Sequence, residues 1–222
     1  IVSGGSLGRE GPLIQFGGAF GKWLGERAKL SAGDVRRLIA AGAAAGFAAA
    51  YNTPFAGVLF VLEVVAGVVV LRTVVPVLVA TVLATQFTRM VSGGGPIYGL
   101  RTFTAEGTVA LLGFAALGVF SALAAQGFMR LLSRAEHDFR RLPVSLPVRA
   151  GLGGLGAGLI IALLPEVAGN GYEPLNRILD GDISLALVLA LLLAKSVATA
   201  CSVGAGSPGG VFTPLMLLGG GL

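Results

Sequence analysis

The sequence predicts an all-α, polytopic membrane protein with broken and tilted helices. Its 222 residues are 55% hydrophobic and only 12% charged, whereas about 25% of residues are charged in ordinary soluble domains. Several uncharged apolar tracts reach or approach the roughly 20 residues that a spanning helix needs. Gly, Pro or Asn interrupts some of them, and broken helices are tolerated at membrane depth only where protein or a water-filled cavity covers the backbone. The tracts are Leu38–Leu62, Thr73–Thr88, Gly107–Met129, Ala150–Pro165 and Ser196–Leu222.

The first predicted element is a helix from Pro12 to about Gly25, which a glycine-rich approach precedes. Pro12 suits the first helical turn, because the N–H that proline lacks is not needed there. A helix N-terminus carries roughly half a positive charge and unpaired N–H groups, so it binds anions. Glu10 places a carboxylate where such an anion would lie. On this stretch alone, the more ordinary interpretation is that Glu10 only caps its own helix.

The last predicted element repeats the first. Residues 8–18 and 210–220 both read Gly-x-x-x-Pro-Leu-x-x-x-Gly-Gly. In transporters, two short glycine-interrupted apolar segments at corresponding positions of two halves indicate a substrate site at a repeat interface. Together with Glu10, the repeat favours two half-helices that point at one anion.

Apolar helices alternate with basic loops between these two copies. The basic residues gather in two loops, within residues 26–37 and after Met129, and the positive-inside rule places both loops on the cytoplasmic side. A break is expected at Tyr51-Asn52-Thr53-Pro54, and a polar connection at 165–182. The expected helices are Leu38–Ala50, Phe55–Val65, a segment after Arg72 that ends at Met90, Gly107–Met129, Pro147–Leu164 and Ile183–Ser202.

Two further features inside the apolar tracts carry expectations about packing. Lys195 lies within a predicted span, where it either reaches the membrane interface or pairs with a carboxylate. The chain holds 36 glycines, and small residues let membrane helices approach closely. The expected helix contacts are Gly113, Gly118, Gly151, Gly154 and Gly158.

Several function classes have no support in the sequence. The single Cys201 excludes an internal disulfide, and the single His137 gives no basis for a metal site. No nucleophile and base pair and no phosphate loop is present, so we expect neither enzymatic activity nor a cofactor. The net charge of +5 is dispersed over short loops, which fits a lipid bilayer better than nucleic acid.

Three motifs resemble the CLC family of chloride channels and chloride/proton antiporters. Gly8-Arg9-Glu10-Gly11-Pro12 is similar to its Gly-Lys/Arg-Glu-Gly-Pro signature, and Gly210-Val211-Phe212-Thr213-Pro214 to its Gly-x-Phe-x-Pro signature. Residues 43–60, between them, also fit the family closely. The resemblance implies an inverted-repeat CLC-type architecture within one partial transmembrane domain, 1–222. Residues 1–91 would end the first half, and about 105–222 would form most of the second.

The resemblance also implies a function and a site. Each subunit of a homodimer would carry its own chloride pathway, and the subunits would meet through helices within Phe55–Met90. Glu10 would be the gating glutamate. The backbone amides of Arg9, Glu10 and Gly11 would line an outer anion site, and those of Val211 and Phe212 a central one.

Two departures from the family pattern bear on this interpretation. The family's remaining central ligands, a Ser and a late Tyr, would fall before Ile1 and after Leu222, so we expect a fragment lacking both ends, and anion selectivity stays open. Antiporters commonly carry a second Glu at position 64, where this chain has Val64. We therefore favour a channel in the plasma membrane of a prokaryote. A chloride/proton antiporter, which would also move protons, is the alternative, and a membrane scaffold without transport is a remote one.

Overall fold

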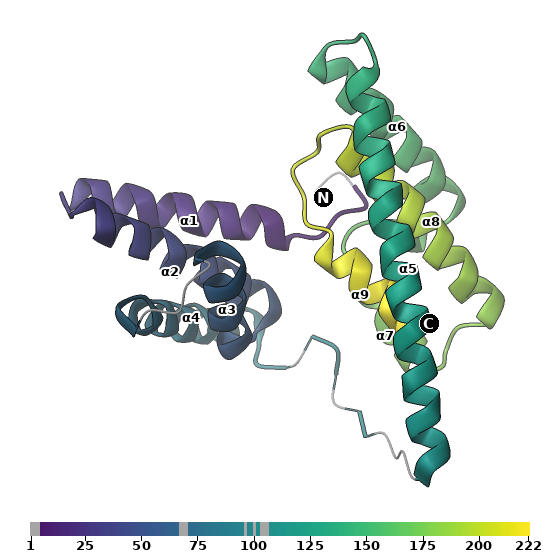
Figure 1. Cartoon of the computed structure of the whole chain (residues 1–222), viewed down its shortest axis with the longest axis horizontal. Helices are drawn as coiled ribbons and strands as arrows, with labels where there is room; N and C mark the ends of the chain where they lie inside the picture. Colours follow the sequence, from purple (N-terminus) through teal and green to yellow (C-terminus); the bar gives the residue numbers. More distant parts are fainter. Residues whose placement is uncertain (1–4, 67–70, 96, 100, 103–106) are drawn as a thin grey trace. The chain divides into compact units, whose positions relative to one another are not determined.

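The computed structural model describes residues 5–66, 71–95, 97–99, 101–102 and 107–222. Within those ranges the regular structure is helical and no strand forms, which confirms the all-α prediction. The helices belong to two compact units, one formed by Arg9–Ile97 and the other by Ile1–Gly8 with Tyr98–Leu222. Figure 1 shows the first unit in purple to blue and the second mainly in green to yellow.

The unit Arg9–Ile97 is built on a pair of helices in direct backbone contact. It contains α1 (Glu10–Arg27), α2 (Ala32–Tyr51), α3 (Pro54–Phe60), the π-helix η1 (Val61–Ala66) and α4 (Leu71–Ser92). Helix α2 packs against both α1 and α4. Its alanines form a buried core with residues of α3, η1 and α4.

Glycines decide how closely α1 and α2 approach. A Cβ atom added to Gly17 would overlap the carbonyl oxygen of Gly42, and one added to Gly42 would overlap that of Gly17. The same overlap occurs between Gly46 and Leu13 on one side, and between Gly21 and Leu38 on the other. Because the partner number falls as the residue number rises, the two helices run antiparallel. No side chain fits between them at these positions.

The glycines singled out in the sequence do not make such contacts. A Cβ on any of these five would meet no described atom within 4 Å, because they lie on faces of α5 and α6 against which no described residue packs. The expectation that they are contact points was therefore wrong for the described chain. They are Gly113, Gly118, Gly151, Gly154 and Gly158.

The boundaries of α2 follow from its capping residues. At its start the Asp34 N–H donates to Ser31 Oγ at 3.2 Å, and the Ser31 hydroxyl donates to Asp34 Oδ2 at 2.7 Å. This hydroxyl, aided by Arg37, lowers the pKa of the Asp34 carboxyl below its ordinary value. The cap starts the helix at Ala32, so the part of the expected basic loop that follows is helical.

The expected break between α2 and α3 is confirmed. Asn52 ends α2 in the left-handed conformation, with φ of 57°. Asparagine tolerates this conformation better than most residues. Pro54 then occupies the first position of α3, where its fixed φ suits a helix start.

In the second unit the helices surround α8. This unit contains α5 (Gly107–Arg141), α6 (Leu146–Leu163), the 3₁₀ turn η2 (Pro165–Val167), α7 (Tyr172–Leu179), α8 (Leu185–Gly204) and α9 (Phe212–Gly220). Helix α8 packs against α5, α6 and α9, and α7 packs against α9. Among the residues that the structure describes, four helices, α4, α5, α6 and α8, are long and apolar enough to cross a membrane. This supports the multi-pass prediction.

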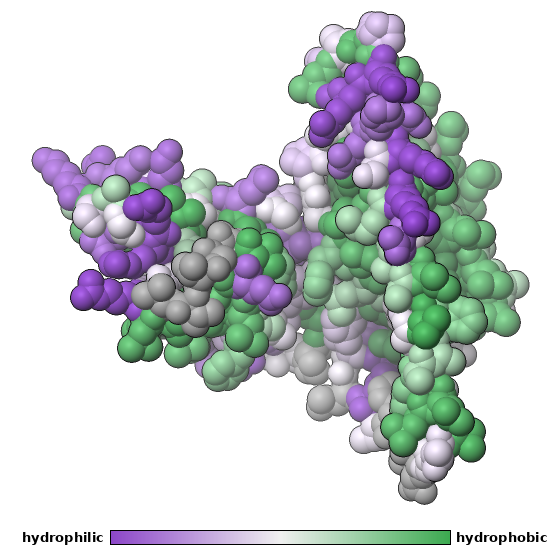
Figure 2. Space-filling model, viewed as in Figure 1, coloured by the Kyte–Doolittle hydropathy of each residue, from purple (hydrophilic) through white to green (hydrophobic). Residues whose placement is uncertain are grey.

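Helix α5 is longer than expected. It continues past Met129 to Arg141, so its basic residues and His137 lie on a helix and not in a loop. Between Met129 and Pro143 the sequence contains neither Gly nor Pro. At 1.5 Å per residue its 35 residues span about 52 Å, against about 30 Å for the hydrocarbon core. Figure 2 shows the corresponding change from an apolar to a hydrophilic surface towards the Arg140 end.

The polar connection after α6 also folds more than expected, since it contains η2 and α7. This connection also explains how Lys195 of α8 can be fully buried. The Lys195 ammonium donates to the carbonyl oxygens of Val167 at 2.9 Å and Gly169 at 2.6 Å. We had expected Lys195 to reach the membrane interface or to pair with a carboxylate. It does neither, because the turn brings two backbone acceptors within its reach.

Candidate functional site

The first motif forms the start of α1. Arg9 is the N-cap residue, and its side chain does not cap the helix. Glu10 is the first helical residue and is 4% exposed, and Pro12 is the third helical residue. The Arg9 guanidinium donates to the carbonyl oxygen of Ala50 in the last turn of α2, at 2.9 Å. The charge of Arg9 is thereby directed at the end of a neighbouring helix.

The second motif forms the start of α9 in the same way. Val211 is the N-cap residue without a side-chain cap, and Phe212 is the first helical residue. Thr213 is fully buried, and Pro214 is again the third helical residue. The repeat seen in the sequence is thus also a repeat of local structure, with each helix starting two residues after the motif's first glycine.

The first glycines of the two motifs are paired with each other. The Gly8 N–H donates to the Gly210 carbonyl at 2.7 Å, and the Gly210 N–H donates to the Gly8 carbonyl at 2.9 Å. These two glycines occupy equivalent positions of the repeat. Reciprocal bonds between equivalent residues are what a local pseudo-two-fold axis produces, as in transporters with inverted repeats.

Buried hydroxyl groups lie next to this pair, and sequence reasoning missed them. Ser6 is fully buried, and its Oγ lies 3.3 Å from Oγ1 of Thr199 on α8. A signal did exist in the sequence, because Ser196, Thr199 and Ser202 recur every third residue within an apolar tract. Such spacing places polar groups on one side of a helix.

Glu63 and Val64, the residues on which the choice between a channel and an antiporter depends, lie on η1. The expected helix Phe55–Val65 ends as an α-helix at Phe60 and continues as a π-helix. Glu63 and Val64 are both exposed there, Val64 by 64%. Single π turns occur frequently at functional sites. A one-residue change in helical repeat leaves no compositional signal, so the sequence could not reveal it.

No metal site is evident: in the parts of the chain that the structure describes, no three His, Cys, Asp or Glu side chains gather in a way that could hold a metal ion. Besides the charged side chains of Arg9 and Glu10, the polar groups near the motifs include backbone amides and the hydroxyls of Ser6 and Thr199. Such groups suit an anion that is bound weakly by partial charges.

Comparison with known proteins agrees with these features. The profile of the voltage gated chloride channel family matches residues 1–222. A ClcB-like chloride channel protein of Ralstonia nicotianae is 37% identical over 226 residues, which cover 100% of this chain and 53% of that protein. The voltage-gated ClC-type chloride channel ClcB of Citrobacter koseri is 33% identical over 222 residues, covering 99% and 52%.

A solved structure gives the same result for the fold. The crystal structure of a slow cyanobacterial Cl⁻/H⁺ antiporter matches with a TM-score of 0.85 and 28% identity, covering 97% of this chain and 51% of that chain. The chain thus spans about half the length of the relatives it matches. The family profile covers the whole chain and the solved structure nearly all of it, so the chain belongs to the CLC family of voltage gated chloride channels.

Proposed function

We propose that the protein moves chloride across a membrane as a passive channel, with helix N-termini binding the ion. The observation that carries this proposal is the pair of equivalent motif helices, α1 and α9, each without a side-chain cap at its start. The relatives named as chloride channels support it. The function proposed is transport and not catalysis, and the bacterial relatives favour the plasma membrane of a prokaryote.

Backbone amides supply the proposed anion sites. Those of Arg9, Glu10 and Gly11 line an outer site, and those of Val211 and Phe212 line a central site. A fixed cation would hold chloride too tightly for conduction, whereas partial charges let it enter and leave. The hydrogen bond from the Arg9 guanidinium to the Ala50 carbonyl is consistent with this, because it directs that positive charge at the last turn of α2.

Glu10 is the proposed gate. Its carboxylate competes with chloride for the outer site, and protonation removes the negative charge that makes it a competitor. Glu10 is buried at the first position of α1. A buried carboxylate is costly unless hydrogen-bond donors lie nearby, and the start of a helix offers backbone N–H groups as such donors. The burial of Glu10 there therefore supports this role. The proposed halves of the inverted repeat are about 1–91 and about 105–222. The compact units do not follow these halves throughout, because Ile1–Gly8 belongs to the same unit as Tyr98–Leu222.

Val64 favours a channel over an antiporter, because valine cannot carry a proton. The antiporter is the second candidate function, because a similar solved structure is that of a Cl⁻/H⁺ antiporter. For a channel, the reversal potential in planar bilayers follows the chloride gradient and does not respond to a pH gradient at fixed chloride. A reversal potential that shifts reproducibly with the pH gradient would establish the antiporter and a proton route that bypasses Val64.

The proposed homodimer is held by helices within Phe55–Met90. Val75 and Val79 of α4 are 55% and 52% exposed, whereas Val77 is fully buried in the core that contains the α2 alanines and cannot lie at a subunit interface. Within the proposed interface segment, Val68, Val69 and Val70 are also valines that the sequence places there, and they lie outside the described residues. We expect Val75→Trp and Val79→Trp to shift the purified full-length protein towards monomer in detergent. The matched control, Leu111→Trp on the exposed face of α5, leaves the dimer intact; equal behaviour of all three variants would contradict the proposed interface.

A further inference from the structure

A short segment that follows the first unit folds onto α7. We call Tyr98, Gly99 and Arg101 the strap. The Arg101 side chain is only 17% exposed and lies 2.8 Å from Oδ1 of Asp180. Its guanidinium also donates to the side-chain and backbone oxygens of Asn176 at 3.2 Å, and to the Tyr98 carbonyl. Arg101 therefore links the two ends of the strap, through the Tyr98 carbonyl, and also joins the strap to α7.

The contact point on α7 suits a cation. Asp180 is the C-cap residue of α7, and Asn176 lies in its last turn. The C-terminus of a helix carries roughly half a negative charge, and hydrogen bonds between ionised partners are about twice as strong as neutral ones. Arg101 combines a positive charge with several N–H donors, which suits these oxygen acceptors. Sequence reasoning missed it, since nothing local links Arg101 to a carboxylate 79 residues away.

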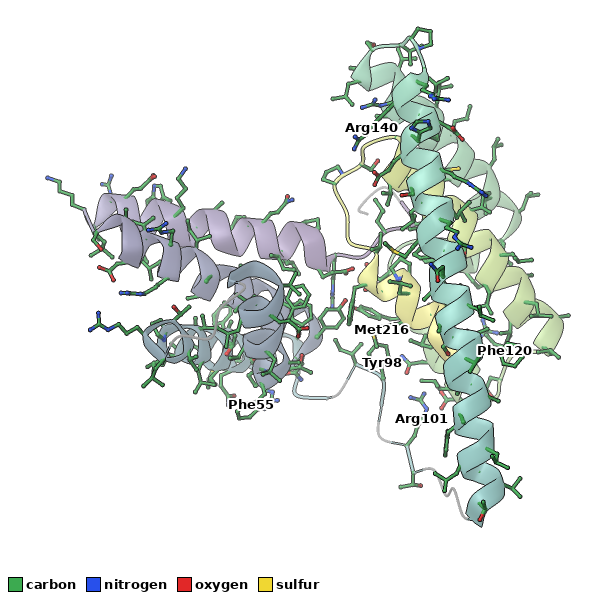
Figure 3. The ribbon with its side chains drawn as sticks, in the orientation of Figure 1. Phe55, Tyr98, Arg101, Phe120, Arg140 and Met216 are labelled. Atoms are coloured by element: carbon green, nitrogen blue, oxygen red, sulfur yellow. The ribbon has the colours of Figure 1, made fainter. Side chains whose placement is uncertain are left out.

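Tyr98 extends the strap to α9. Its hydroxyl donates to Sδ of Met216 at 3.2 Å, and its ring meets that of Tyr172 edge to face, with centroids 5.7 Å apart. Figure 3 shows Tyr98 beside Met216, with Arg101 close by. Met216 belongs to α9, the second motif helix. The strap thus contacts α9 directly as well as through α7.

Helices α7 and α9 are themselves closely packed. A Cβ on Gly220 of α9 would overlap Cδ1 of Leu175, and one on Gly171 would lie 3.3 Å from Cδ2 of Leu217. Because the two helices pack so closely, the position of α7 restricts the position of α9. On its other contacts α9 meets apolar side chains of α5 and α8. Apolar packing is non-directional, so it leaves the depth and rotation of a nine-residue helix less well defined than hydrogen bonds do.

We propose that the strap fixes the position of α9 and so aligns the Val211 and Phe212 amides for the anion. Tyr98 and Arg101 are positioning residues, since neither lies in the motif. This inference rests on the proposed function, because it assigns the strap to the central anion site. A misplacement of about 1 Å in a positioned group can cost about 100-fold in activity, so directional contacts of this kind have a measurable effect.

The test compares variants of the full-length protein by isothermal titration with chloride, by flux in liposomes and by thermal unfolding. Arg101→Ala raises the chloride dissociation constant about tenfold, and Asp180→Asn raises it in the same direction. Tyr98→Phe, which keeps the ring and removes one weak hydrogen bond, has a smaller effect. Arg101→Lys keeps the charge and restores part of the affinity.

Arg177→Ala is the matched control. Arg177 also lies on α7 but forms its ion pair with Glu166, at 4.0 Å, and we expect this variant to bind chloride as the wild type does. A dissociation constant for Arg101→Ala and Asp180→Asn within about twofold of the wild type overturns the strap, as does an equal loss in Arg177→Ala. A wild-type protein that binds no chloride overturns the proposed function, and the strap with it.

Discussion

Replacing Glu10 by glutamine makes chloride flux nearly independent of pH and removes any proton coupling. Glutamine has nearly the shape of protonated glutamate but carries no charge, so it cannot compete electrostatically with chloride at the start of α1. The proposed gate would then stay in its protonated-like state at every pH. Flux from chloride-loaded liposomes, compared between the variant and the wild type over a series of pH values, measures the effect.

The control for this experiment lies on the same helix. Glu26 is in the last turn of α1, 60% exposed and 3.8 Å from Lys22, so Glu26→Gln makes the same chemical change away from the motif. We expect Glu26→Gln to keep the wild-type pH dependence. Glu10→Ala should behave as Glu10→Gln does. Wild-type pH dependence in both Glu10 variants would remove Glu10 from the gate.

Replacing Gly42 by valine strongly destabilises the protein. Even the Cβ atom overlaps the carbonyl oxygen of Gly17, which belongs to the backbone and cannot rotate away. Helices α1 and α2 must move apart, and this movement disturbs the contacts of α2 that form the core of this unit. Overpacking typically costs about 1–3 kcal/mol, and we expect the upper end of that range or more. Thermal unfolding in detergent, followed by circular dichroism, measures it.

A glycine on the same helix provides the comparison. Gly33 lies in the first turn of α2, and a Cβ there would meet only Ser31 Oγ, at 3.8 Å. Gly33→Ala should therefore be neutral or stabilising by up to about 1 kcal/mol, since alanine is the better helix former. If Gly42→Val and Gly33→Ala melted alike, close contact between α1 and α2 would not contribute to stability.

The features that the sequence predicted well are local ones. The starts of α1 and α9 follow from Pro12 and Pro214, each of which fits only the first turn of a helix. The break before α3 follows from Asn52 and Pro54. Each of these depends on the conformational preference of one or two residues. The role of Glu10 as a gate stays a prediction.

What the sequence could not predict depends on tertiary contacts. Lys195 has its acceptors on a turn that is not its sequence neighbour, and Arg101 meets Asp180 only because α7 forms within an apparently polar connection. Glycines at contact points look the same in sequence as glycines that contact nothing, as Gly42 and Gly113 show. Spacing identifies which residues share a face of a helix, but not which face meets a neighbour.

The reciprocal bonds between Gly8 and Gly210 have a consequence for the order of folding. They join residues that are about 200 positions apart in the sequence, and closing so long a loop costs conformational entropy that only later contacts offset. During synthesis this pairing must wait until the approach to α9 has emerged from the ribosome. Gly8, just before α1, is made earlier than Gly210, so it lacks this hydrogen-bonding partner until the approach to α9 has been synthesised. A mutation that delays α9 would accordingly prolong the exposure of a segment far upstream of itself.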